Sequence, residues 1–121
     1  MSFVTDDVMR KLPQMDRSAA DALPYGAIKV DDEGTIELYN KWESDLAGVP
    51  VSSAEGKNFF TQIAPCTNNR LVRGRFKDGE ATGEMDFELK YTFTYKMKPT
   101  NVKLRAVKDP VSKSNWIFVS T

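Results

Sequence analysis

The chain has 121 residues, 40% hydrophobic and 11% aromatic, which predicts one globular domain with a single hydrophobic core. Seventeen basic residues balance 17 acidic ones, so the zero net charge gives no overall attraction to nucleic acid or to an anionic membrane. The absence of histidine and the single cysteine, Cys66, exclude Cys–His and Ser–His–Asp catalysis, a zinc site built from Cys and His, and an internal disulfide.

The first 24 residues are expected to form a small helical cap. Thr5 to Lys11 has the pattern of a short helix, with two acidic residues in its first turn and Pro13 after its end. Residues 18–23 predict a second helical turn before Pro24. Neither this segment nor any later run is apolar enough for a signal peptide or a membrane span. We therefore expect a cytoplasmic protein, and a monomer because nothing in the sequence demands a dimer.

Residues 25–121 are expected to form the domain proper. Residues 27–30 and 35–39 have the composition of two strands joined by a hairpin turn at 31–34. Short helices should follow before the next strand. Their expected limits are Asn40 as N-cap with the helix continuing through Ala47, a turn capped by Asn58, and a helix from Asn69 through Lys77 that closes at Gly79.

The clearest pattern is MDFELKYTFTYKM, residues 85–97, in which every odd position is apolar or aromatic and every even position is polar. This period of two predicts a long strand with one buried and one wet face. A turn at 99–101 and strands at 102–107 and 116–119 complete five antiparallel strands. The fold class is therefore α+β, a five-stranded sheet with short helices on one face, which would place Cys66 beside the aromatic row of the long strand.

Four stretches together resemble the photoactive yellow protein family, which comprises bacterial blue-light receptors with a PAS fold. They are AIKVDDEGTIELYNKWESDLAG, GKNFFTQIAPCT, YTFTYKMKPT and NWIFV. The resemblance runs without a gap from about Leu23 to Val119 and is specific only when the four are taken jointly. It implies that Cys66, in the APCT motif, carries 4-hydroxycinnamic (p-coumaric) acid as a covalent thioester.

The resemblance also implies the other residues of the pocket. Tyr39 and Glu43 would hydrogen-bond the phenolate of the pigment, and Met97 would influence recovery in the dark. The remaining residues implied around the pigment are Phe59, Ala64, Pro65, Thr67, Tyr91, Phe93 and Tyr95. Two positions depart from the family pattern: Ala47 replaces a threonine and Val49 replaces an arginine, so we expect altered colour and altered recovery kinetics.

The residues by themselves leave other interpretations open. A lone cysteine is more often a small core residue than a reactive thiol, and Tyr39 and Glu43 could be a strand-end tyrosine and a solvated helix glutamate. The chain could then be a PAS-like module that binds a non-covalent ligand or a protein partner. A thiol enzyme is disfavoured because the chain lacks the usual base, and we expect no enzymatic activity.

With the pigment in place, burial and a neighbouring phenolate would keep Glu43 neutral in the dark. The hypothesis is that trans/cis isomerisation makes Glu43 give its proton to the phenolate, and the buried carboxylate then drives partial unfolding of the weakly packed N-terminal arm. The downstream signalling protein is not identified by the sequence. The N-terminal arm and an exposed sheet face are the expected output surface.

Overall fold

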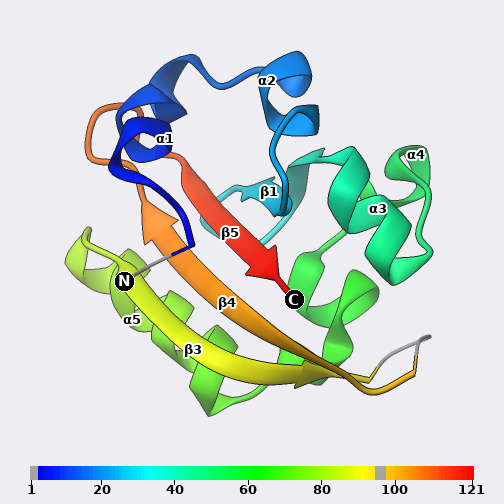
Figure 1. The fold of residues 1–121 in the computed structure, drawn as a ribbon. Coiled ribbons are helices and arrows are strands. Elements are labelled where there is room, and N and C mark those ends of the chain that lie inside the picture. The colour runs from blue at the N-terminus through cyan, green and yellow to red at the C-terminus, as the bar shows by residue number, and fades with distance from the viewer. Residues whose placement is uncertain (1–2, 95–97) are drawn as a thin grey trace.

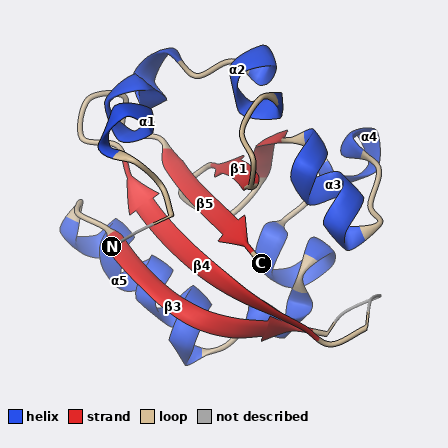
Figure 2. Cartoon of the chain, viewed as in Figure 1, coloured by secondary structure: helices blue, strands red, loops and turns tan. Residues whose placement is uncertain are grey.

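The computed structural model describes residues 3–94 and 98–121, which contain a five-stranded antiparallel sheet with the strand order β2-β1-β5-β4-β3 (Figures 1 and 2). The strands are β1 (Gly26–Val30), β2 (Ile36–Tyr39), β3 (Asp86–Phe93), β4 (Thr100–Lys108) and β5 (Asn115–Ser120). The α-helices are α1 (Asp6–Lys11), α2 (Arg17–Asp21), α3 (Lys41–Ala47), α4 (Val51–Ala54) and α5 (Arg75–Thr82). Short 3-10 and π segments are η1 (Leu12–Gln14), η2 (Phe59–Ile63), η3 (Pro65–Thr67) and η4 (Arg70–Gly74). The expected α+β class, five strands and helical cap are confirmed.

The alternation predicted for the long strand is present in β3. Met85, Phe87 and Phe93 are buried, Tyr91 is half-buried, and the even positions from Asp86 to Thr94 are exposed. The inward side chains join the larger of two apolar clusters, which also contains Phe59 and residues of η4 and α5. This cluster lies between the sheet and the segments from α3 to α5, and it forms the main core.

A second apolar cluster lies on the opposite face of the sheet, and Figure 1 shows the N-terminal helices there, with α5 on the other side. Val4, Leu12 and Ala20 of the cap pack with Trp116 and Phe118 of β5. The two β5 rings stack with an interplanar angle of 6°. The cap therefore covers the centre of this face, whereas the outward side chains of β3 and of the Thr100 end of β4 are exposed.

The end of α5 differs from the expectation that a helix closes at Gly79. The helix continues to Thr82 and ends at Gly83, which has the left-handed φ of 79° that glycine tolerates. Gly79 serves close packing instead, because a Cβ at this position would fall 2.7 Å from the Cβ of Met85. A glycine needed for packing therefore resembled a helix stop in the sequence.

Candidate functional site

The junction between β2 and α3 brings Tyr39 and Glu43 to one side of the main core. Tyr39 is the last residue of β2, Asn40 is the N-cap of α3, and Glu43 lies in the first helical turn. The Asn40 Oδ1 accepts hydrogen bonds from the backbone N–H of Glu43 (3.1 Å) and of Ala27 in β1 (3.0 Å). This cap fixes the start of the helix against the sheet, so the two side chains enter the protein together. Both are almost fully buried, with exposed fractions of 1% and 2%.

A narrow cavity of about 20 Å³ joins these two side chains to the cysteine. A space of this size holds about one water molecule. Four segments of the chain contribute to its lining: the β2–α3 junction, α3, the stretch from η2 to η3, and the end of β3. The lining residues are Tyr39, Glu43, Ala47, Phe59, Ile63, Ala64, Cys66 and Phe93.

The carboxyl group of Glu43 is the most unusual group in this cavity. Its Oε1 is buried and has no hydrogen-bond partner among the described residues. Burial raises the pKa of Glu43 to about 8, so the group is mostly neutral at pH 7 and carries a proton it can donate. Burial also raises the pKa of Tyr39 and keeps its phenol protonated. A buried polar atom without a partner costs about 1–3 kcal/mol, and a polar group bound beside Glu43 would remove this cost.

Gly26 makes room for that carboxyl group, and the sequence analysis missed it. A Cβ built on Gly26 would lie 2.2 Å from Glu43 Oε1 and 3.3 Å from the Glu43 Cβ. The glycine at the start of β1 therefore lets the backbone approach the glutamate closely. A glycine opening a strand is a weak signal that sequence reasoning alone cannot tell from an ordinary turn residue.

Cys66 is half-buried in η3, and its backbone is held from two directions. The Tyr91 hydroxyl donates a hydrogen bond to the Cys66 carbonyl oxygen, and Asn69 Nδ2 donates to the same oxygen at 3.1 Å. Within the turn, Thr67 Oγ1 donates to the Ala64 carbonyl at 2.6 Å. These contacts fix the turn that presents the sulfur to the cavity.

Most of the residues expected around the pigment meet at this cavity. Val49, Pro65, Thr67 and Tyr91 are not among its lining residues. Val49 packs at the edge of the main core, and its carbonyl accepts a hydrogen bond from Ser44 Oγ at 2.6 Å. Ile63 lines the cavity but was not predicted, because one more apolar residue in a short helical turn carries no distinctive signal. The expectations for Tyr95 and Met97 fall outside the described residues.

The β2–α3 junction is tied to the cap helix α2 at three consecutive residues. Asn40 Nδ2 donates to the Ala20 carbonyl at 2.8 Å, and the Lys41 N–H donates to Asp21 Oδ1 at 2.8 Å. The Tyr39 N–H donates at 3.0 Å to Glu55 Oε2, the same oxygen that forms an ion pair with Arg17. A movement of the junction would therefore change the hydrogen bonds that hold the cap helix α2.

The strand order, the short helices on one face and a buried cavity beneath them define a PAS-type sensory domain. No protein-family model matches the chain. Among solved structures, the photoactive yellow protein domain of the sensor histidine kinase Ppr from Rhodospirillum centenum superposes with a TM-score of 0.87 at 40% identity, covering 93% of this chain and 99% of that domain. The quorum-sensing receptor PAS domain of Cronobacter turicensis RpfR, with a TM-score of 0.64 at 15% identity over 81% of this chain and 93% of that domain, shares the fold alone.

Curated relatives agree with this likeness. The photoactive yellow protein of Rhodothalassium salexigens is 40% identical over 98% of this chain and 95% of its own length. That of Halochromatium salexigens is 41% identical over 97% of this chain and 94% of its own length. The chain therefore belongs to the photoactive yellow protein family, and it is a photoreceptor. Within the described residues, no helix is long and apolar enough to span a membrane.

Proposed function

We propose that the chain is a blue-light receptor that carries p-coumaric acid as a thioester on Cys66. The observation that carries the proposal is the buried Glu43 Oε1, which has no hydrogen-bond partner in residues 3–94 and 98–121, in a cavity that Tyr39 and Cys66 also line. A carboxyl that is neutral at pH 7 and a tyrosine hydroxyl are the two donors that a buried phenolate requires. The residues present therefore fit this pigment chemically.

Each part of the site has a role in holding the group. Cys66 supplies the sulfur for the thioester, and the turn around it is fixed by Tyr91, Asn69 and Thr67. Phe59 and Phe93 supply apolar walls that exclude water. When bound, the pigment supplies absorption in the blue, a double bond that isomerises in light, and a phenolate oxygen.

Glu43 is the proposed proton source of the switch. A pKa raised from 4.5 to about 8 means that ionising Glu43 inside the protein costs about 5 kcal/mol more than ionising it in water. Once Glu43 gives its proton to the phenolate, this cost falls on the folded state. It is comparable with the 5–15 kcal/mol that stabilises a small domain.

The opening of the fold should begin where the strained junction meets the cap. Glu43 lies in the first turn of α3, and Tyr39, Asn40 and Lys41 are tied to α2 directly or through Glu55. The α2 helix has only five residues and depends on these contacts. We therefore infer that cap release is the first structural output of the site.

Reconstitution tests the proposal directly. The purified chain is mixed with an activated p-coumaroyl thioester or anhydride, and the visible spectrum and intact mass are recorded before and after. We expect a yellow product with the added mass on Cys66 and reversible bleaching in blue light, while Cys66→Ala stays colourless. A colourless wild-type product would contradict the proposal and favour a PAS module for a non-covalent ligand or a protein partner.

A second experiment separates the buried-charge step from pigment binding. Glu43→Gln should still bind the pigment but show a smaller light-induced change in hydrogen exchange across the cap. Glu37→Gln, on the exposed side of β2, makes the same side-chain substitution away from the cavity and should behave like the wild type. An unchanged exchange response in Glu43→Gln would remove Glu43 from the switch.

A further inference from the structure

The outer face of the sheet is the face that carries the cap, and its distal part, at the Phe93 end of β3 and the Thr100 end of β4, is not covered by the cap. In the register between β4 and β5, Arg105 lies opposite Phe118 and Val107 lies opposite Trp116. Val107, Trp116 and Phe118 pack under the cap. The next row toward the distal end consists of Lys90, Lys103 and Ser120, followed by Thr92 opposite Asn101. None of these five residues belongs to either apolar cluster.

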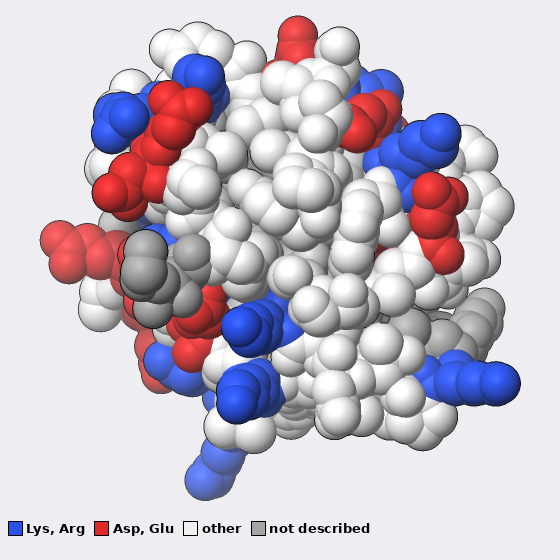
Figure 3. All heavy atoms as spheres, in the orientation of Figure 1, with Lys and Arg blue, Asp and Glu red and all other residues white. Residues whose placement is uncertain are grey.

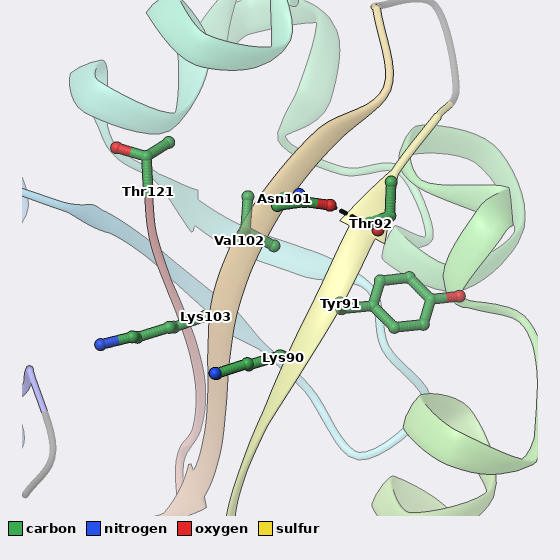
Figure 4. Close-up of a pocket in the computed structure, with 7 residues that line it drawn as sticks. All are labelled: Lys90, Tyr91, Thr92, Asn101, Val102, Lys103 and Thr121. Atoms are coloured by element: carbon green, nitrogen blue, oxygen red, sulfur yellow. Dashed lines mark hydrogen bonds between the residues drawn. The ribbon is translucent and has the colours of Figure 1, made fainter.

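An open groove of about 780 Å³ lies along this uncovered region (Figure 4). In the figure, Lys90 and Lys103 extend in the same direction from neighbouring strands, and the Tyr91 ring points the opposite way. The groove is lined by Lys90, Tyr91, Thr92, Asn101, Val102, Lys103 and Thr121. No carboxylate side chain is among these lining residues.

The two lysines form a pair of unneutralised charges. Lys90 and Lys103 stand directly opposite one another on β3 and β4, and both are exposed. Neither forms an ion pair with any residue of 3–94 or 98–121, whereas Arg105 in the adjacent row pairs with Asp86 at 2.8 Å. Like charges at directly opposed positions destabilise a sheet. Figure 3 shows basic side chains standing over the middle of β3 and β4, with uncharged surface to their right and acidic side chains to their left.

We propose that this groove docks an acidic segment of a partner protein. Carboxylates of such a segment would neutralise the opposed lysines, which the fold itself leaves unpaired. The Thr92 Oγ1 donates to Asn101 Oδ1 at 2.8 Å, and the Asn101 amide nitrogen has no acceptor within the described part of the chain, so it can donate to a partner carbonyl. A membrane surface fits less well, because Leu71 and Val111, the exposed large apolar residues among those the structure describes, do not line the groove.

The groove shares strand β3 with the cysteine site. Lys90 faces the groove, while the hydroxyl of the next residue, Tyr91, donates a hydrogen bond to the Cys66 carbonyl on the other side of the strand. The docking surface is therefore one residue along the strand from a contact with the functional turn. Docking itself concerns the pigment-free chain and does not depend on the proposed function.

Fluorescence anisotropy of a labelled oligo-glutamate peptide tests the proposal on the full pigment-free chain. At low ionic strength the wild type should bind, and the Lys90→Gln/Lys103→Gln double variant should bind about 2- to 30-fold more weakly, the range for losing two exposed ion pairs. Salt at about 1 M, where the screening length is about 3 Å, should abolish the difference. Lys57→Gln/Lys77→Gln is the matched control, because both lysines are exposed, lie outside the groove and form no ion pair among the described residues.

The outcomes separate this groove from general charge attraction. Binding by the wild type and by the control, with loss only in Lys90→Gln/Lys103→Gln, supports the groove. Equal loss in both double variants, or no binding of the peptide by the wild type, overturns the proposal. Lysine-dependent binding to vesicles of phosphatidylcholine and phosphatidylserine without binding to the peptide overturns it in favour of a membrane surface. Coincident thermal unfolding curves of the two variants confirm that folding is not the cause.

Discussion

Replacing Glu43 by glutamine should change how the stability of the pigment-free protein depends on pH. The glutamate has a pKa of about 8 when folded and 4.5 as its ordinary value, so between these values the folded state holds a proton that the unfolded state has lost. Its protonation supports folding fully below pH 4.5, and this support is lost as the pH rises through 8. Glutamine keeps the shape of the side chain and does not titrate.

The size of the effect follows from the same shift. Glu43→Gln should equal the wild type within about 1 kcal/mol near pH 4.5 and gain about 1.4 kcal/mol per pH unit above it, reaching about 5 kcal/mol above pH 8. Urea unfolding followed by tryptophan fluorescence at a series of pH values measures the difference. Glu37→Gln, at an exposed position, should show no such slope. A difference between Glu43→Gln and wild type that stays flat from pH 5 to 9 would show that Glu43 is not a buried neutral acid.

Three further predictions concern the supports of the site. Gly26→Ala places a methyl group against the Glu43 carboxyl and should cost about 1–3 kcal/mol in urea unfolding and shift the visible band after reconstitution; wild-type stability and colour would contradict the contact. Glu55→Ala removes the acceptor of the Tyr39 N–H and should lower the free energy of unfolding by about 1–3 kcal/mol. This loss should exceed that of a substitution of Arg17, which breaks only the half-exposed ion pair to Glu55. Lys108→Met leaves the carboxylates of Asp32 and Glu80 without their counter-charge and should lower the free energy of unfolding by about 3 kcal/mol at pH 7. Because burial raises the pKa of Glu80, the loss of stability should shrink on acidification. An equal loss at pH 5 would contradict the ion pair between Lys108 and Glu80.

Local features of this chain were predictable from the sequence because their causes act over a few residues. Asn40 caps α3 and Ala47 ends it as expected, since the Asn40 side chain and the left-handed C-cap after Ala47 satisfy backbone groups of the adjacent turns. The period of two predicted which side chains of β3 face inward. The spacing of Tyr39 and Glu43 across a strand–helix junction allowed the two to share a pocket, and the resemblance to the photoactive yellow protein family favoured this over a solvated glutamate.

The remaining features depend on how distant segments pack, and no local pattern encodes that. Gly79 stands inside α5 because Met85 packs against it, and Gly26 opens β1 because the Glu43 carboxyl lies on it. The pairing of Lys90 with Lys103 follows from the register between β3 and β4. Apolar residues pack on both faces of the sheet, so the sequence pattern alone does not tell which of them belong to the main core and which lie under the cap. Residue types and their period determine which side chains of a helix or strand face inward. Tertiary contacts determine which segment of the chain those side chains pack against.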